Sequence, residues 1–170
     1  MAVRPILKLG HPILARRSEA IGDITSDVVS FSKDMIQTMH AAPGIGLSAP
    51  QIGENIRLIT VDLSTGARKE DLIVLFNPEI VREEGSVARE EGCLSVPEIY
   101  ENVTRPQKIT LKGLDIEGRE RFFEAENLLA RVFCHEIDHL NGRLFVDYLS
   151  PLKRNLIRRK FRKLYPPPKA

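Results

Sequence analysis

The stretch Phe133-Cys-His-Glu-Ile-Asp-His-Leu140 decides how this chain is organised. On an α-helix, residues four positions apart lie on one face and about 6 Å apart along the axis. His135 and His139 therefore project from the same face, close enough for both rings to bind one metal ion. Glu136 lies about 100° further around the helix, where its carboxylate can flank the ion and accept a proton from water. The pattern predicts a helix that carries a hydrolytic metal site.

Two histidines leave a metal ion short of ligands, so another part of the chain must supply a third. Cys134 is rotated about 100° from His135 on the same helix, and we expect it to be a small buried residue instead. Cys93 follows Gly92 in a segment that looks irregular, which is an unusual place for a core cysteine. A Cys93 thiolate would complete a site with three protein ligands and an open fourth position, an arrangement typical of catalytic metals.

The length and composition are those of a soluble globular domain. The 170 residues are 42% hydrophobic and 28% charged, and no apolar run approaches the roughly 18–20 residues that a membrane-spanning helix needs. Two cysteines provide no disulfide framework, and residues 1–10 lack the apolar core of a signal peptide. We expect one catalytic domain, 1–170, located in the cytoplasm and without membrane contact.

The pattern of apolar residues predicts an α+β fold. Apolar residues recur at helical spacing within 28–40 and indicate a helix. His40 lies near its C-terminal end, where a positive side chain interacts favourably with the helix dipole. The metal helix is expected at 125–140. Stretches rich in β-branched residues predict strands at 56–61, 72–76, 79–82, 86–89, 108–112 and 121–123. We expect mixed or antiparallel β-sheets around a central metal-binding helix, with further helices toward both termini.

The C-terminal segment predicts a basic amphipathic helix over 150–165. Ser150 is a good N-cap and Pro151 is a good first helical residue. From Ser150 onward there are eight Lys/Arg and no acidic residue, whereas the rest of the chain has a net negative charge. An apolar stripe accompanies the charges and consists of Leu152, Leu156, Ile157, Phe161 and Leu164. The basic face is either simply solvated or a contact for ribosomal RNA.

A glycine-rich segment, Gly44-Ile-Gly-Leu-Ser-Ala-Pro-Gln-Ile-Gly53, precedes the strands. Three glycines and a proline in these ten residues predict irregular backbone, and glycine lets another backbone approach closely. The segment lacks the Lys-Ser/Thr pair of a phosphate-binding loop. Taken alone it is a weak signal, a turn that carries one polar side chain, Gln51.

Three segments in this order and spacing resemble the signature motifs of bacterial peptide deformylases, namely Gly44–Gln51, Glu91–Ser95 and His135–His139. The likeness runs from Leu9-Gly-His-Pro-Ile-Leu14 to Phe145-Val-Asp-Tyr-Leu149 and so covers nearly the whole chain. Two departures are Ser48, where the family usually has alanine, and Arg131, in a region where the family's substrate pocket tends to be apolar. The resemblance implies hydrolysis of the formyl group from the formyl-methionine of nascent chains, with release of formate.

The resemblance also implies a metal and its base. Cys93, His135 and His139 would hold one divalent ion, commonly Fe²⁺ in cells, with Zn²⁺, Ni²⁺ or Co²⁺ as accepted alternatives. The ligand types alone would suit zinc equally well, so iron rests on the resemblance. Glu136 would accept a proton from water and later pass it to the departing amine. Asp138, on the same helix, is expected to form a structural charge pair with Arg105.

Further roles concern the substrate. The side-chain amide of Gln51 and the backbone N–H of Leu94 would donate to the oxyanion, as in the family. An extended peptide would pair with the backbone near Ile45 and Gly46, like an added strand. The residues expected to contact the substrate are Ile45, Gly46, Glu91, Gly92, Leu128 and Val132. Ile45, Leu128 and Val132 could line a pocket for the methionine side chain, since Leu128 and Val132 share the helix face of His135. Alternatively, these three are ordinary core residues.

Two other classes of function compete with this interpretation. A metallopeptidase of the His-Glu-x-x-His type would take its third ligand downstream of the helix, but the chain has no His or Glu after His139. A nucleic-acid or ribosome-binding module would use the basic helix at 150–165 and keep the metal for structure. Loss of activity without loss of metal in a Glu136→Ala variant would separate an enzyme from such a module.

Overall fold

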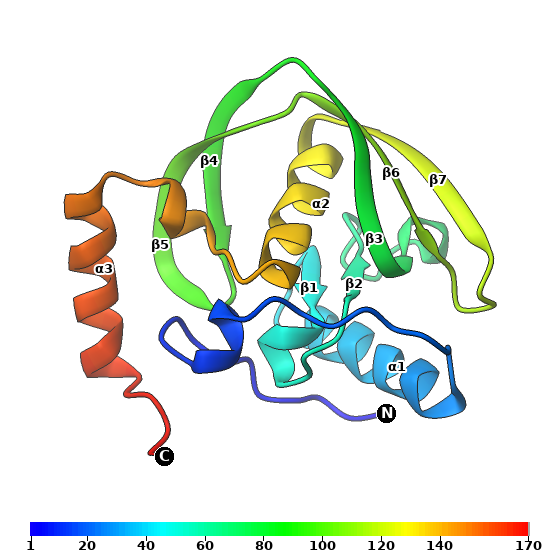
Figure 1. Ribbon diagram of the computed structural model, residues 1–170, viewed down its shortest axis with the longest axis horizontal. Coiled ribbons are helices and arrows are strands. Elements are labelled where there is room, and N and C mark those ends of the chain that lie inside the picture. The colour runs from blue at the N-terminus through cyan, green and yellow to red at the C-terminus, as the bar shows by residue number, and fades with distance from the viewer. Residues whose placement is uncertain (170) are drawn as a thin grey trace.

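The computed structural model describes residues 1–169 and contains three α-helices and seven β-strands (Figure 1). The helices are α1 (Ser26–Ala41), α2 (Asn127–Leu140) and α3 (Pro151–Leu164). The strands are β1 (Gly46–Ser48), β2 (Leu58–Val61), β3 (Ile73–Glu84), β4 (Val87–Cys93), β5 (Val96–Arg105), β6 (Lys108–Leu114) and β7 (Glu120–Glu126). The strands pair antiparallel, which confirms the predicted α+β class.

Helix α2 lies at the centre of the molecule, with β4 and β5 on one side and β3, β6 and β7 on the other (Figure 1). Five strands form one sheet in the order β1-β2-β3-β6-β7. The buried face of α2, which includes Phe133 and Ile137, shares an apolar cluster with Ile59, Leu75 and Leu111 of this sheet. Burial of each such side chain contributes about 1.5–3 kcal/mol, so the metal helix is fixed along the core.

Strands β4 and β5 form a separate two-stranded sheet, here called the β4–β5 ribbon. Its register runs from Val87 opposite Arg105 to Cys93 opposite Val96, with a shift just before Cys93. Its buried valines, Val96 and Val103, belong to a second apolar cluster together with Leu9, Leu14, Leu144, Phe145, Val146 and Phe161. The apolar residues of the ribbon and of α2 therefore lie in different clusters.

Helix α1 starts as predicted within two residues and packs its methionines inward. Thr25 caps it by accepting a hydrogen bond from the N–H of Val28. Met35 and Met39 are fully buried against residues of β1, β2 and β3. His40 has a more specific partner than the helix dipole, because its Nε2 lies 2.7 Å from Oδ2 of Asp62.

Two sequence predictions about the backbone were wrong. The glycine-rich segment is not irregular, since it contains β1 and a 3₁₀ helix at Ala49–Ile52. Cys93 is the last residue of β4 rather than part of an irregular stretch, and β5 beyond it was missed. Strand β3 also continues through Asn77-Pro78, where Asn77 adopts a left-handed φ of 52°.

Helix α3 matches the predicted range, but its apolar stripe is only partly buried. Phe161 is 1% exposed in the second apolar cluster, and Ile157 is partly buried against it. Leu152 and Leu164 stay exposed beside the basic residues. Within residues 1–169, no helix is long and apolar enough to cross a membrane.

Candidate metal centre and active site

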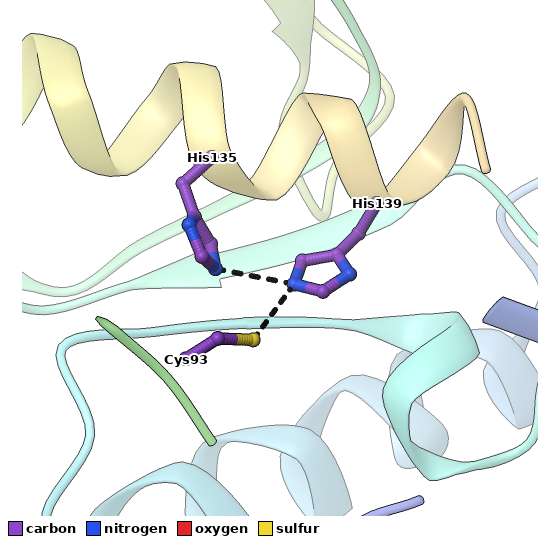
Figure 2. A group of neighbouring side chains, drawn as sticks. All are labelled: Cys93, His135 and His139. Atoms are coloured by element: carbon purple, nitrogen blue, oxygen red, sulfur yellow. Dashed lines mark hydrogen bonds between the residues drawn. The ribbon is translucent and has the colours of Figure 1, made fainter. Parts of the chain in front are cut away.

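Cys93, His135 and His139 converge on one point between α2 and the end of β4 (Figure 2). The Nε2 atoms of the two histidines are 3.1 Å apart, and Sγ of Cys93 lies 3.3 Å from Nε2 of His139. All three ligand atoms lie within 4.8 Å of one another. Figure 2 shows both rings descending from the helix toward the sulfur, as the four-residue spacing predicts.

The two shorter separations fit a tetrahedral metal ion. With metal–nitrogen bonds of about 2.0–2.1 Å and a metal–sulfur bond of about 2.3 Å, tetrahedral angles place two nitrogens about 3.3 Å apart and nitrogen and sulfur about 3.6 Å apart. The observed 3.1 Å and 3.3 Å are within a few tenths of an ångström of these values. Cys134 is not part of this group but belongs to the apolar cluster of α2, where burial raises the pKa of its thiol to about 12.

Glu136 is buried beside the triad with a free carboxylate oxygen. Among residues 1–169, its Oε2 atom has no hydrogen-bond partner. Burial raises the pKa of Glu136 to about 7, which suits a group that must both accept and release a proton near neutral pH. A Cβ atom at Gly46 would lie 2.6 Å from Oε1 of Glu136, so glycine is needed where β1 passes this side chain.

Gln51 is fixed in place by a residue that the sequence marked only as a departure from the family. Its Oε1 accepts hydrogen bonds from the backbone N–H of Ser48 at 2.9 Å and from the Ser48 hydroxyl at 3.1 Å. This leaves its Nε2 as the outward donor, 3.1 Å from Oγ of Ser95 and 3.6 Å from Sγ of Cys93. The amide is therefore oriented with its N–H groups toward the metal site.

A buried charge network supports His135 from behind. Oε1 of Glu91 lies 3.5 Å from Nδ1 of His135, and both oxygens of Glu91 accept hydrogen bonds from Arg105, at 3.3 and 3.0 Å. Arg105 also donates to Asp138 at 2.6 Å, which confirms the predicted charge pair. Burial opposes ionisation of Glu91, but the hydrogen bonds and positive charges of His135 and Arg105 hold its pKa below the ordinary value.

Glu91 was predicted to contact substrate, and sequence reasoning missed its place behind His135. A carboxylate that accepts from a ligand histidine fixes the ring orientation and makes the ring a better donor to a metal. The pairing brings together β4 and α2, which are about forty residues apart in the chain, so only the fold reveals it.

A pocket of about 640 Å³ opens beside the triad. Its walls include all six residues expected to contact the substrate, Ile45, Gly46, Glu91, Gly92, Leu128 and Val132, and also Gln51, Leu94 and Glu136. Leu128 is 52% exposed and so is not an ordinary core residue, whereas Val132 is buried in the pocket wall. Arg131, noted in the sequence as a departure in the pocket region, also lines the pocket, and so does Tyr100, which was not predicted to do so.

Comparisons with known proteins place the chain in one family. The family model described as polypeptide deformylase matches residues 3–155. The chain is 47% identical over 162 residues to a peptide deformylase of Thermodesulfovibrio yellowstonii, covering 95% of this chain and 98% of that protein. It is 46% identical over 165 residues to a peptide deformylase of Rhizobium meliloti, covering 96% and 94% of the two chains.

Solved structures agree with the sequence relatives. A crystal structure of a peptide deformylase from Legionella pneumophila matches with a TM-score of 0.90 at 45% identity, covering 96% of this chain and 95% of that one. The peptide deformylase from Ehrlichia chaffeensis, in complex with actinonin, matches with a TM-score of 0.89 at 34% identity, covering 98% and 99%. The chain therefore belongs to the peptide deformylase family, enzymes that hydrolyse the N-formyl group from nascent peptides and release formate.

Proposed function

We propose that Cys93, His135 and His139 hold one divalent ion, Fe²⁺ in cells, and that the side chains around it carry out deformylation. The convergence of one sulfur and two imidazole nitrogens within 4.8 Å of one another, beside a pocket, carries this proposal. A bound ion supplies Lewis acidity, which lowers the pKa of a water molecule toward about 7. Zn²⁺, Ni²⁺ or Co²⁺ would suit the same ligands.

Glu136 handles the protons in this proposal. Its free Oε2 accepts a proton from the attacking water and then donates it to the nitrogen of the leaving peptide amine. A carboxyl group with a pKa of about 7 can perform both transfers near neutral pH. Glu91 and Arg105 keep His135 in one orientation throughout, since Glu91 accepts from the ring and is itself held by Arg105.

Two donors stabilise the oxyanion that develops when the formyl carbon becomes tetrahedral. They are the Nε2 group of Gln51, which Ser48 orients, and the backbone N–H of Leu94. Loss of one such donor costs about 2.7–4 kcal/mol of transition-state stabilisation. The N–H groups are fixed before the substrate arrives, so they need no reorganisation during the reaction.

The substrate runs along the edge of the five-stranded sheet. Strand β1 is the terminal strand of that sheet, so its outer side can pair with an extended peptide near Ile45 and Gly46. The methionine side chain enters the pocket between Leu128 and Val132. The substrate is an N-formylated nascent chain. We place the enzyme in the cytoplasm as one catalytic domain spanning 1–170.

Release of formate from formyl-Met-Ala by anaerobically purified protein, with metal content measured on the same sample, tests this proposal. Glu136→Ala should abolish formate release and leave the metal bound. Glu54→Ala, a change at an exposed glutamate away from the pocket, is the matched control and should leave both unchanged. A Glu136→Ala variant that retains wild-type turnover would refute the role of Glu136.

We further propose that α3 contacts ribosomal RNA. Exposed apolar side chains, among them Leu152, and several basic residues share its surface. Deleting 150–170 would abolish binding, but it would also remove the buried Phe161, so a charge variant is cleaner. Arg159→Gln with Lys163→Gln should weaken ribosome binding in a steeply salt-dependent way, while formate release stays the same. Binding that is absent, or insensitive to salt, would end this proposal.

A further inference from the structure

The β4–β5 ribbon must hold the Cys93 sulfur in place opposite α2, yet its apolar residues do not pack on that helix. Val96 and Val103 are buried against the N-terminal segment and residues near Phe145, in a cluster separate from that of α2. Figure 1 shows the ribbon and the helix as neighbours. The ribbon is a sheet of its own and does not pair with the five-stranded sheet on which α2 packs. The gap between them is therefore fixed largely by polar side chains.

One cross-link between the two is Arg105 of β5. Its guanidinium binds Asp138 of α2 at 2.6 Å and Glu91 of β4 at 3.0 Å, and the side chain is only 4% exposed. This link lies on the C-terminal side of His135 along the helix. Glu91 in turn lies 3.5 Å from Nδ1 of His135, so these polar contacts join the ribbon to α2 from His135 toward the C-terminal end of the helix.

Arg131 makes a second cross-link, in which a side chain of α2 reaches to the ribbon. Its Nη1 donates to the carbonyl oxygen of Val103 in β5, and its Nη2 donates to the carbonyl oxygen of Val87 in β4, both at 2.8 Å. The residue is 6% exposed, and no carboxylate among residues 1–169 lies within ion-pair distance of its guanidinium. A buried guanidinium that donates one hydrogen bond to each of two strands fixes both strands relative to its own helix.

The two links bracket His135. Arg131 and Asp138 are seven positions apart, which is two turns and about 10.5 Å along the helix axis, with His135 between them on the same face. Their contacts on β5 are the backbone carbonyl of Val103 and the side chain of Arg105, which are two residues apart along the strand. We propose that Arg131 is a positioning residue that sets the spacing between the β4–β5 ribbon and α2, and thereby the fit of Cys93 to the metal.

This inference rests on the proposed metal site and is tested on Co²⁺-loaded protein, in which a thiolate ligand produces a charge-transfer absorption band. Arg131→Met keeps the length of the stem and removes both hydrogen bonds. Arg131→Lys keeps the charge and can reach only one of the two carbonyls. The matched control is Arg57→Met, because Arg57 also donates to a backbone carbonyl, that of Leu140 at 3.0 Å, but at the end of the helix rather than on the ribbon.

We expect Arg131→Met to shift or weaken the thiolate band and to release cobalt to a chelator at least tenfold faster than wild type, the range found for residues that support metal ligands. Arg131→Lys should restore part of both properties, and Arg57→Met should change neither, although it lowers the melting temperature. If Arg131→Met does not fold, the same comparison is made between Arg131→Lys and wild type.

Two results would overturn the inference or its basis, and they are distinguishable. Arg131 variants that lose thermal stability but keep the wild-type band and release rate would give Arg131 a merely structural role. A wild-type protein without any thiolate band would instead refute Cys93 as a ligand, and with it the proposed metal site.

Discussion

Replacing Glu136 by glutamine should abolish deformylation and, at the same time, stabilise the metal-free protein at pH 8. Burial raises the pKa of Glu136 to about 7 from an ordinary value of 4.5, so the fold favours the protonated form. The stability that this preference provides is fully present below pH 4.5 and is lost as the pH rises through about 7. Relative to its value well below pH 4.5, the unfolding free energy is therefore lower by about 3 kcal/mol at pH 8, where the buried carboxylate is ionised. It is lower by about 1 kcal/mol at pH 5, where the folded protein keeps the proton but the unfolded chain has mostly released it.

Urea unfolding of chelator-treated protein at pH 8 and pH 5 measures this cost directly. Glu136→Gln should gain about 3 kcal/mol over wild type at pH 8 and about 1 kcal/mol at pH 5. The control is Glu91→Gln, which should lose stability at pH 8 because His135 and Arg105 hold the pKa of Glu91 below its ordinary value despite burial. A gain for Glu136→Gln that is absent, or that is the same at both pH values, would refute the reasoning.

Three further substitutions test other parts of the site. Gly46→Ala places a Cβ atom 2.6 Å from Oε1 of Glu136 and must displace that carboxylate. Formate release should fall at least about a hundredfold because the carboxylate is no longer aligned with the reacting groups. Wild-type turnover would contradict the close approach. Ser48→Ala removes only the hydroxyl hydrogen bond to Gln51, worth about 1 kcal/mol, and keeps the one from the backbone N–H. The value of kcat should therefore fall less than about tenfold. A far larger loss would show that the backbone hydrogen bond does not hold the amide. Arg105→Met leaves the buried Glu91 and the partly buried Asp138 without their cation and should lower the unfolding free energy by about 3–5 kcal/mol. A loss below about 1 kcal/mol in urea would argue against the network.

The elements with strong local signals were predictable from the sequence. Helix α2 combines apolar periodicity with a stop at Asn141-Gly142, and the observed end at Leu140 matches. Its start was predicted two residues early because β7 continues to Glu126. The placement of His135 and His139 on one helix face followed from spacing alone. Cys93 was proposed as the third ligand because its segment looked irregular, and it lies beside both histidines although that segment is the end of β4.

The elements that were missed depend on contacts distant in sequence. Strand β5 alternates buried and partly exposed residues but contains Pro97, acidic side chains and a left-handed Glu98, which all speak against a strand locally. Strand β1 uses Gly46 for its close approach to Glu136, and neither residue signals the other in the sequence. Ser48 and Arg131 stood out only as departures, because the partners that explain them lie on other segments of the chain.

The K-edge X-ray absorption spectrum of the zinc-loaded protein tests the proposed metal site most directly. We predict one sulfur at about 2.3 Å, two imidazole nitrogens at about 2.0–2.1 Å and a single further light atom, with the sulfur lost in Cys93→Ser. A spectrum without a sulfur scatterer in the wild-type protein would contradict the assignment of Cys93, His135 and His139 as the metal ligands.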